Sequence, residues 1–164
     1  MKFDHFKFLV ESMFIPDEKG CVKQRYADVN PKQLNPLVLA YIGDAYFHLF
    51  VRGKLLNYEQ NKVQVLHRFS AQMVSAVWQA KAYLEMEGLL TEEEKAVFKR
   101  GRNAKSHAPK SASVAEYRMS TGFEALLGYL YLTEQHERLF QIAEKAFTLI
   151  SEAMMAHVQE KKGE

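Results

Sequence analysis

Two carboxylates, Asp44 and Glu124, are the residues of this sequence best suited to chemistry. Asp44 is the only formal charge in residues 34–51. Glu124 is the only formal charge in residues 121–132. At helical spacing most neighbours of the two acids are apolar or small. An ionised carboxylate on such a face is destabilising unless it is paired, protonated or bound to a metal ion. Both charges therefore need a partner.

Glycines beside the two acids suggest how they could meet. Gly43, Gly122 and Gly128 would allow the helices that carry the acids to approach closely. Asp44 and Glu124 could then share one divalent cation, since Mg²⁺ is often held by one or two carboxylates with water and phosphate as further ligands. Carboxylates suit Mn²⁺ as a substitute. The alternative is that each acid pairs with an Arg or Lys inside the core, and both interpretations stay open.

His48 is the one further polar residue placed beside an acid. It follows Asp44 by four residues, the spacing at which helical side chains meet, and can hydrogen-bond to it. The alternative is a histidine packed in the core without a role. Other chemistry lacks support, because the sequence has no two-His helical zinc motif, no Gly-rich phosphate loop, no Gly-x-Ser-x-Gly elbow and no Cys cluster.

A basic segment, residues 99–110, lies between the two acids in the chain. It holds five Lys or Arg residues and no acid, and Pro109 predicts an irregular loop. Such residues neutralise and hydrogen-bond phosphates, as nucleic-acid binding requires. A solvated loop is the alternative. The predicted phosphate contacts are Arg100, Arg102, Asn103, Lys105, Ser106 and Lys110.

The elements that must position these residues are predicted to be helices, in an all-α fold. No stretch alternates with period two between turn signals, so a sheet is not expected. Asn35 with Pro36 marks one helix start, and capping-box patterns begin at Thr91 and Ser113. The expected helices cover residues 36–52, 63–69, 71–87, 92–100, 113–132 and 134–159, with Gly53 and Gly88 near two of the ends.

Composition bounds the organisation and location of the chain. Its 164 residues, 48% of them hydrophobic, predict one globular domain over residues 31–164. Residues 1–30 are expected to form an N-terminal extension with a short helix and a turn at residues 16–20. A net charge of +2 means that nucleic-acid binding needs a local basic patch.

No export signal or membrane span is expected. The lone Cys21 fits a reducing compartment, and charges interrupt the apolar residues of the N-terminus. Residues 34–51 are long enough to span a membrane, but the central Asp44 favours a buried core helix. The sequence therefore predicts a cytoplasmic protein without membrane contact.

These motifs resemble those of the ribonuclease III family. Residues 41–45, Tyr-Ile-Gly-Asp-Ala, are similar to the end of its signature, which supplies a catalytic aspartate. Residues 123–128 resemble its second acidic motif, and residues 103–106 resemble the lysine-containing loop before that motif. The resemblance covers residues 33–132 in the family's order and spacing.

Departures from the family pattern indicate a particular branch. Leu37 and Ala40 stand where the family has glutamates seven and four residues before the aspartate, and Thr121 stands where it has a further aspartate. The residues after 132 read as one helix, without room for a double-stranded-RNA-binding domain. This reduced pattern is similar to the mini-ribonuclease III subfamily of bacteria.

The resemblance implies a homodimeric, Mg²⁺-dependent endoribonuclease that cleaves double-stranded RNA and leaves 5′ phosphates. Asp44 and Glu124 would be its catalytic residues and metal ligands, with a metal-activated water attacking the phosphorus in line. The implied substrate is the 23S ribosomal RNA precursor. A ribosomal protein or the folded rRNA is the candidate source of sequence selectivity, because double-stranded RNA is read mainly by shape.

The predicted dimer contact involves the helix at residues 36–52 and the helix that carries Glu124, because both look too apolar for one exposed face. The competing hypothesis is a non-catalytic helical RNA-binding or ribosome-assembly module in which the two acids are paired internally. A third hypothesis, a helical metal phosphohydrolase acting on nucleotides, ranks lower because this sequence lacks the His-Asp ligand pairs that such an enzyme needs.

Overall fold

The computed structural model describes residues 4–13, 15–22, 26, 28–105 and 112–160, and its regular elements are all helices. Within these residues the only β-type pairing is an isolated bridge between Pro16 and Val22. The predicted all-α fold is confirmed. The elements are α1 (His5–Met13), α2 (Pro36–Leu55), α3 (Val63–Met73), α4 (Ala76–Met86), η1 (Glu87–Leu89), α5 (Glu92–Arg102), α6 (Val114–Leu132) and α7 (His136–Glu160).

The chain divides into two compact units, residues 1–30 and 31–164. The first contains α1 and a turn in which Gly20 adopts a positive φ of 78°. The second contains the other helices and the hydrophobic core. Among the described helices, none combines the length and apolar character that crossing a bilayer requires.

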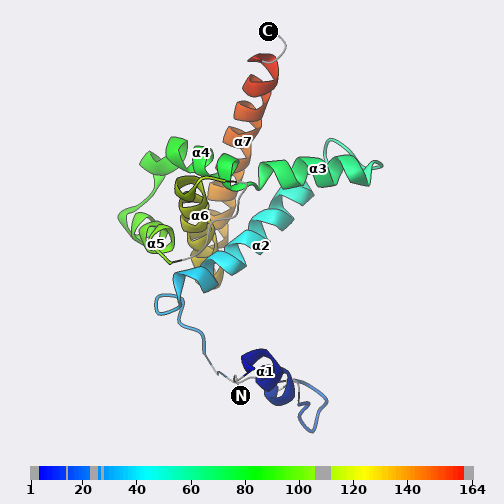
Figure 1. Cartoon of the computed structure of the whole chain (residues 1–164), viewed down its shortest axis with the longest axis vertical. Helices are drawn as coiled ribbons and strands as arrows, with labels where there is room; N and C mark the ends of the chain where they lie inside the picture. The colour runs from blue at the N-terminus through cyan, green and yellow to red at the C-terminus, as the bar shows by residue number, and fades with distance from the viewer. Residues whose placement is uncertain (1–3, 14, 23–25, 27, 106–111, 161–164) are drawn as a thin grey trace. The chain divides into compact units, whose positions relative to one another are not determined.

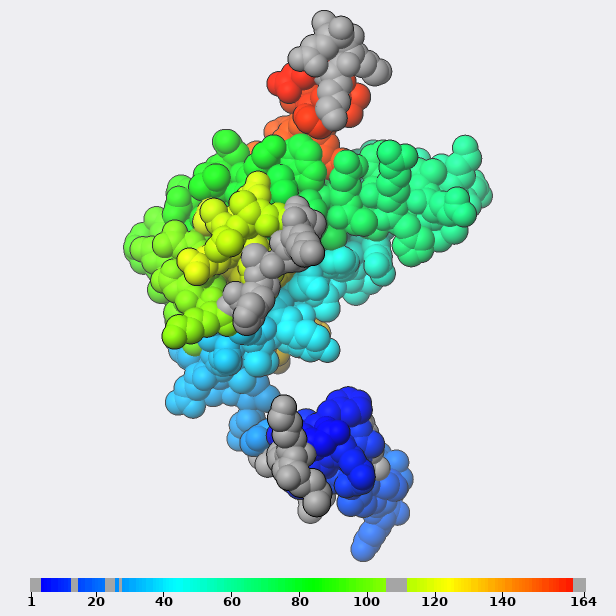
Figure 2. All heavy atoms as spheres, viewed as in Figure 1, coloured from blue at the N-terminus to red at the C-terminus, as the bar shows by residue number. Residues whose placement is uncertain are grey.

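Helix α6 is the centre of the larger unit. It packs against α2, α4, α5 and α7, which surround it in Figure 1. From Ser120 to Leu130 every residue of α6 is buried except Glu124. The two ends of α6 reach the surface, at Val114 and at Tyr131, and its start is visible beside α4 and α5 in Figure 2. The apolar character of α6 is thus explained by burial within its own chain, which corrects the reason given for a dimer contact through this helix.

Helices α2 and α6 cross with their backbones in direct contact. A Cβ atom added to Gly43 would lie 1.8 Å from the carbonyl oxygen of Glu124, and one added to Gly128 would lie 1.9 Å from the carbonyl oxygen of Leu39. Both positions therefore require glycine. The predicted close approach of the two acidic helices is found at these residues.

A similar contact joins α5 to α6. A Cβ atom on Gly101 would lie 2.9 Å from the Cα atom of Gly122, and one on Gly122 would lie 2.7 Å from the ring of Phe98. Gly122 thus serves the α5 contact, whereas Gly43 and Gly128 serve the contact between α2 and α6.

Three of the predicted helix starts are confirmed by their caps. The side chain of Asn35 accepts a hydrogen bond from the Leu37 backbone N–H. Thr91 and Ser113 each form a complete capping box with the glutamate three residues later. These caps satisfy backbone N–H groups that the first turn of a helix leaves without partners.

Several predicted helix ends were wrong. Helix α2 continues through Gly53 to Leu55, and Gly88 lies within η1. Helix α3 extends to Met73, and α4 begins at Ala76 rather than at residue 71. The chain turns at Val74 and Ser75, where Val74 is buried and Ser75 is extended, with φ −68° and ψ 150°. Packing of Val74, rather than a Gly or Pro signal, accounts for this corner.

The glycine contact gives a direct test of the fold. Gly128→Ala should lower the free energy of unfolding by about 3 kcal/mol or more, because a methyl group would collide with the α2 backbone and force the helices apart. Gly53→Ala is the matched control: it lies in α2 with open space around it, and should raise the free energy by about 0.5–1 kcal/mol through helix propensity. Urea unfolding followed by circular dichroism measures both. Equal stability of the Gly128→Ala and wild-type proteins would contradict the crossing.

Candidate functional site

Asp44 and Glu124 come together where α2 crosses α6. Gly43, directly before Asp44, rests against the backbone of Glu124, so the two acidic residues lie on either side of one helix contact. Their side chains interact, since the charge of Asp44 and a hydrogen bond with it both act on the pKa of the Glu124 carboxyl. The structure thus brings together the two acids singled out in the sequence.

The two carboxyl groups have different surroundings. The side chain of Asp44 is 49% exposed, whereas Glu124 sits among the buried residues of α6. Burial, followed by the negative charge of Asp44, raises the pKa of Glu124 to about 8, and the side-chain amide of Gln79 acts in the opposite direction. Placing a second negative charge beside Asp44 is therefore costly unless a cation joins the pair.

His48 contacts Asp44 on the outer side of this pair. Its Nε2 atom lies 3.2 Å from Asp44 Oδ1, within hydrogen-bonding distance, as the four-residue spacing predicted. Both residues belong to α2, so the contact restricts the rotation of the Asp44 side chain on its own helix. It gives His48 a positioning contact with one of the acids.

Neither acid has a Lys or Arg partner among the described residues. No ion pair of this part of the chain joins Asp44 or Glu124 to Lys or Arg. Glu94 shows what such pairing looks like here: it is buried, and its carboxylate is held by Arg138 at 2.7 and 2.9 Å. Within the described residues, the alternative that Asp44 and Glu124 each pair with a core Arg or Lys is therefore not found. Such a pair exists in this fold for another acid, Glu94.

The donor set at the crossing suits a hard divalent cation. Over the described residues no three His, Cys, Asp or Glu side chains gather at one point, so two carboxylates are the ligands that this part of the chain offers. Mg²⁺ accepts such a site, with water and substrate phosphate filling its octahedral shell. The charge of two adjacent carboxylates is what such a cation would neutralise.

Gln79 is a polar residue of this site that sequence reasoning missed. It lies in α4, is fully buried, and donates from Nε2 to the carbonyl oxygen of Val74 at 2.8 Å. Its amide also acts on the Glu124 carboxylate. The available signal was a single uncharged amide within an apolar helical stretch, at a position that faces α6 only once the chain is folded.

The basic segment is only partly a loop. Lys99, Arg100 and Arg102 belong to the last turn of α5, where positive charge suits the helix dipole, and Asn103 ends the helix. The helix predicted to end near residue 100 therefore continues two residues into the segment predicted as a loop. The buried Gly101, packed on α6, holds this turn in helical form.

The predicted phosphate contacts have different environments. Arg100 is exposed but already engaged, since it donates to the carbonyl oxygens of Lys32 at 3.1 Å and Leu34 at 2.9 Å. Arg102, Asn103 and Lys105 are exposed. Ser106 and Lys110 lie outside the described residues.

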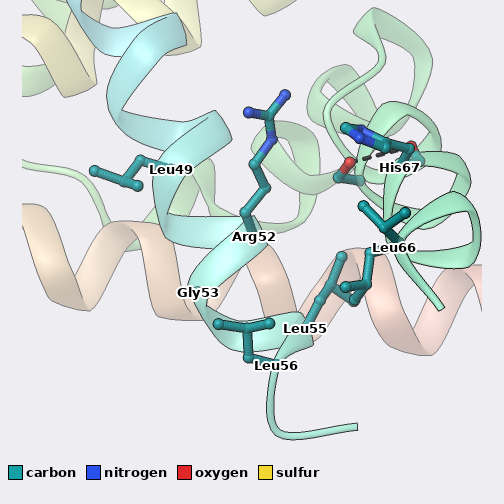
Figure 3. Close-up of a pocket in the computed structure, with 9 residues that line it drawn as sticks. Leu49, Arg52, Gly53, Leu55, Leu56, Leu66 and His67 are labelled. Atoms are coloured by element: carbon teal, nitrogen blue, oxygen red, sulfur yellow. Dashed lines mark hydrogen bonds between the residues drawn. The ribbon is translucent and has the colours of Figure 1, made fainter. Parts of the chain in front are cut away.

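An apolar groove of about 290 Å³ lies between the end of α2 and α3. Figure 3 shows Leu49 and Arg52 of α2 and Leu66 and His67 of α3 around it. Neither acid lines this groove. Its aliphatic lining offers contact surface but no group suited to hydrolysis.

The chain is similar to known ribonucleases. A model of the ribonuclease III domain matches residues 37–135, which include both acids. The Mini-ribonuclease 3 of Enterococcus faecalis is 51% identical over 114 residues, covering 68% of this chain and 86% of that protein. The Mini-ribonuclease 3 of Symbiobacterium thermophilum is 51% identical over 122 residues, covering 74% and 94%. A solved structure of a Fusobacterium nucleatum protein matches with a TM-score of 0.63 and 32% identity, over 69% of this chain and 91% of that one.

Proposed function

The chain belongs to the ribonuclease III family and is an endoribonuclease, and we propose that it cuts double-stranded RNA with a divalent cation held by Asp44 and Glu124. The observation that carries this proposal is the meeting of two carboxylates at the α2–α6 crossing without a Lys or Arg partner among the described residues. In a non-catalytic module we would expect each buried acid to pair with a basic side chain, because an unpaired buried charge is strongly destabilising.

The chain's own residues would hold the cation and orient the reacting groups. When bound, Mg²⁺ supplies an activated water and positive charge for the leaving 3′ oxygen, and the products carry 5′ phosphates. Asp44 is half-exposed and within reach of a phosphodiester, and His48 steadies its carboxylate. Glu124 is fixed by the buried residues around it in α6. Mn²⁺ suits the same oxygen ligands.

The substrate we propose is duplex RNA of the 23S ribosomal RNA precursor, in the cytoplasm. This finer assignment rests on the similarity to Mini-ribonuclease 3 proteins. It also rests on how proteins recognise duplex RNA, which they do by its shape, phosphates and 2′-hydroxyl groups rather than by its bases. The exposed Arg102 and Lys105 are suited to phosphate contacts. A ribosomal protein or the rRNA fold would supply sequence selectivity.

We further propose that the enzyme is a two-fold homodimer formed through α2. Val38, Tyr41 and Leu49 lie at helical spacing on one face of α2 and are 45%, 75% and 72% exposed. Leu49 also lines the groove of Figure 3, so this apolar face continues toward α3. A second copy of the same face would bury it and bring two Asp44–Glu124 sites into one particle, one for each RNA strand.

Removing either carboxylate should abolish cleavage. Asp44→Asn and Glu124→Gln should each reduce the rate on a long RNA duplex about a thousandfold at saturating Mg²⁺, because each removes an anionic ligand of the cation. Glu85→Gln, an exposed acid of α4, is the control and should keep full activity. Gel analysis of cleavage and circular dichroism of folding check this. A folded Asp44→Asn protein with near-normal Mg²⁺-dependent activity would refute the assignment.

The basic residues should separate into two groups. Arg102→Ala with Lys105→Ala should weaken duplex RNA binding and reduce the salt slope by roughly two, one for each lost phosphate contact. Stability should change little, because both side chains are exposed. Arg100→Ala should instead lower stability, since it removes two hydrogen bonds to backbone carbonyls. Binding is measured without divalent cations over a salt series. If the double variant keeps the wild-type affinity and salt slope, Arg102 and Lys105 are not part of the RNA-binding surface.

The dimer is tested by sedimentation at micromolar concentration. The wild-type protein should sediment with twice the chain mass, and Tyr41→Arg with Leu49→Arg should give a folded monomer, because two charges would enter the proposed contact. Leu84→Arg, at a residue of α4 that is 61% exposed, should remain dimeric. A wild-type monomer that cuts both strands of a duplex would contradict the arrangement.

A further inference from the structure

Gln79 is a buried polar residue that has no role in the two-carboxylate site as described so far. It has no exposed surface, and the helix that carries it, α4, packs directly on α6. Its surroundings are otherwise those of the hydrophobic core, with Ala80, Ala82 and Tyr83 buried on the same helix. A glutamine at such a place must meet its hydrogen-bonding needs locally or act on something beside it.

The orientation of the Gln79 amide is fixed by Val74. Nε2 donates to the carbonyl oxygen of Val74 at 2.8 Å, at the corner between α3 and α4. Rotating the amide by half a turn would place Oε1 against that carbonyl, with two acceptors facing each other. Nε2 therefore stays on the Val74 side, and one of its two N–H groups remains for another acceptor.

Two observations connect this amide to the acidic site. The Gln79 side-chain amide lies within hydrogen-bonding reach of the Glu124 carboxyl group, where α4 packs on α6. Gln79 Oε1 is buried and has no hydrogen-bond partner in the part of the chain that the structure describes. The amide thus offers a second N–H group and a free acceptor beside one of the two proposed ligands.

We propose that Gln79 is a positioning residue, which holds the Glu124 carboxylate for the divalent cation through the N–H group that Val74 leaves available. Its Oε1 atom is then an acceptor for a water molecule at the same site. This inference rests on the proposed function, because it takes Glu124 as a cation ligand. Hydrogen-bonding partners of this kind orient metal ligands, and their loss typically weakens metal binding about 10–100-fold.

Mn²⁺ binding to the intact protein without RNA tests the proposal. The probe is free Mn²⁺, measured by electron paramagnetic resonance in titrations of wild-type and Gln79→Met proteins. Methionine keeps the length and approximate volume of glutamine and removes the amide, so Mn²⁺ affinity should fall about 10–100-fold. Ser70→Ala is the control: Ser70 is also buried, and donates one hydrogen bond to the His67 carbonyl on α3. It should leave Mn²⁺ affinity unchanged.

The outcomes separate this inference from the function on which it rests. If wild-type protein binds Mn²⁺ and folded Gln79→Met binds it equally well, Gln79 serves only the α3–α4 corner and the inference is overturned. If wild-type protein binds no Mn²⁺, the proposed function fails first. Should Gln79→Met not fold, nuclear magnetic resonance of the wild-type protein decides. The Gln79 side-chain N–H signals should shift on addition of Mg²⁺, and signals that do not move would overturn the inference.

Discussion

The backbone contact between α2 and α6 is the constraint on which the site depends. Gly43 and Gly128 leave no room for a Cβ atom, so the two helices meet at a distance that other residues would not permit. Asp44 follows directly after one of these glycines, and Glu124 contributes the carbonyl oxygen that the other helix touches. The same contact that closes the core therefore fixes the relative position of the two carboxylates.

Electrostatics makes this position costly for the protein alone. Burial and the neighbouring Asp44 both disfavour an ionised Glu124, while no Lys or Arg pairs with either acid among the described residues. Glu94 shows that the same fold can provide a bidentate arginine for a buried acid. The two sites therefore differ: Glu94 is paired within the chain, whereas the acids at the crossing have no Lys or Arg partner among the described residues.

The sequence indicated the acids, the close glycines and the helix caps, because each depends on residues near one another in the chain. It could not indicate Gln79 or the engagement of Arg100, since their partners lie in other elements: Arg100 binds carbonyl oxygens 66 and 68 residues away. The corner at Val74 was missed for a related reason. It is made by burial of an apolar side chain, which has no local signature, whereas the predicted break signals Gly53 and Gly88 lie within helical turns.

The burial pattern of α6 has a consequence for how its variants would be interpreted. Ten of its residues are buried, and Glu124 is the one position between Ser120 and Leu130 that is not. The helix that carries Glu124 is also the centre of the core, so most substitutions in it should change folding first. A screen for lost activity along α6 would chiefly map stability, and only a parallel measurement of protein abundance would separate an effect at Glu124 from a loss of folded protein.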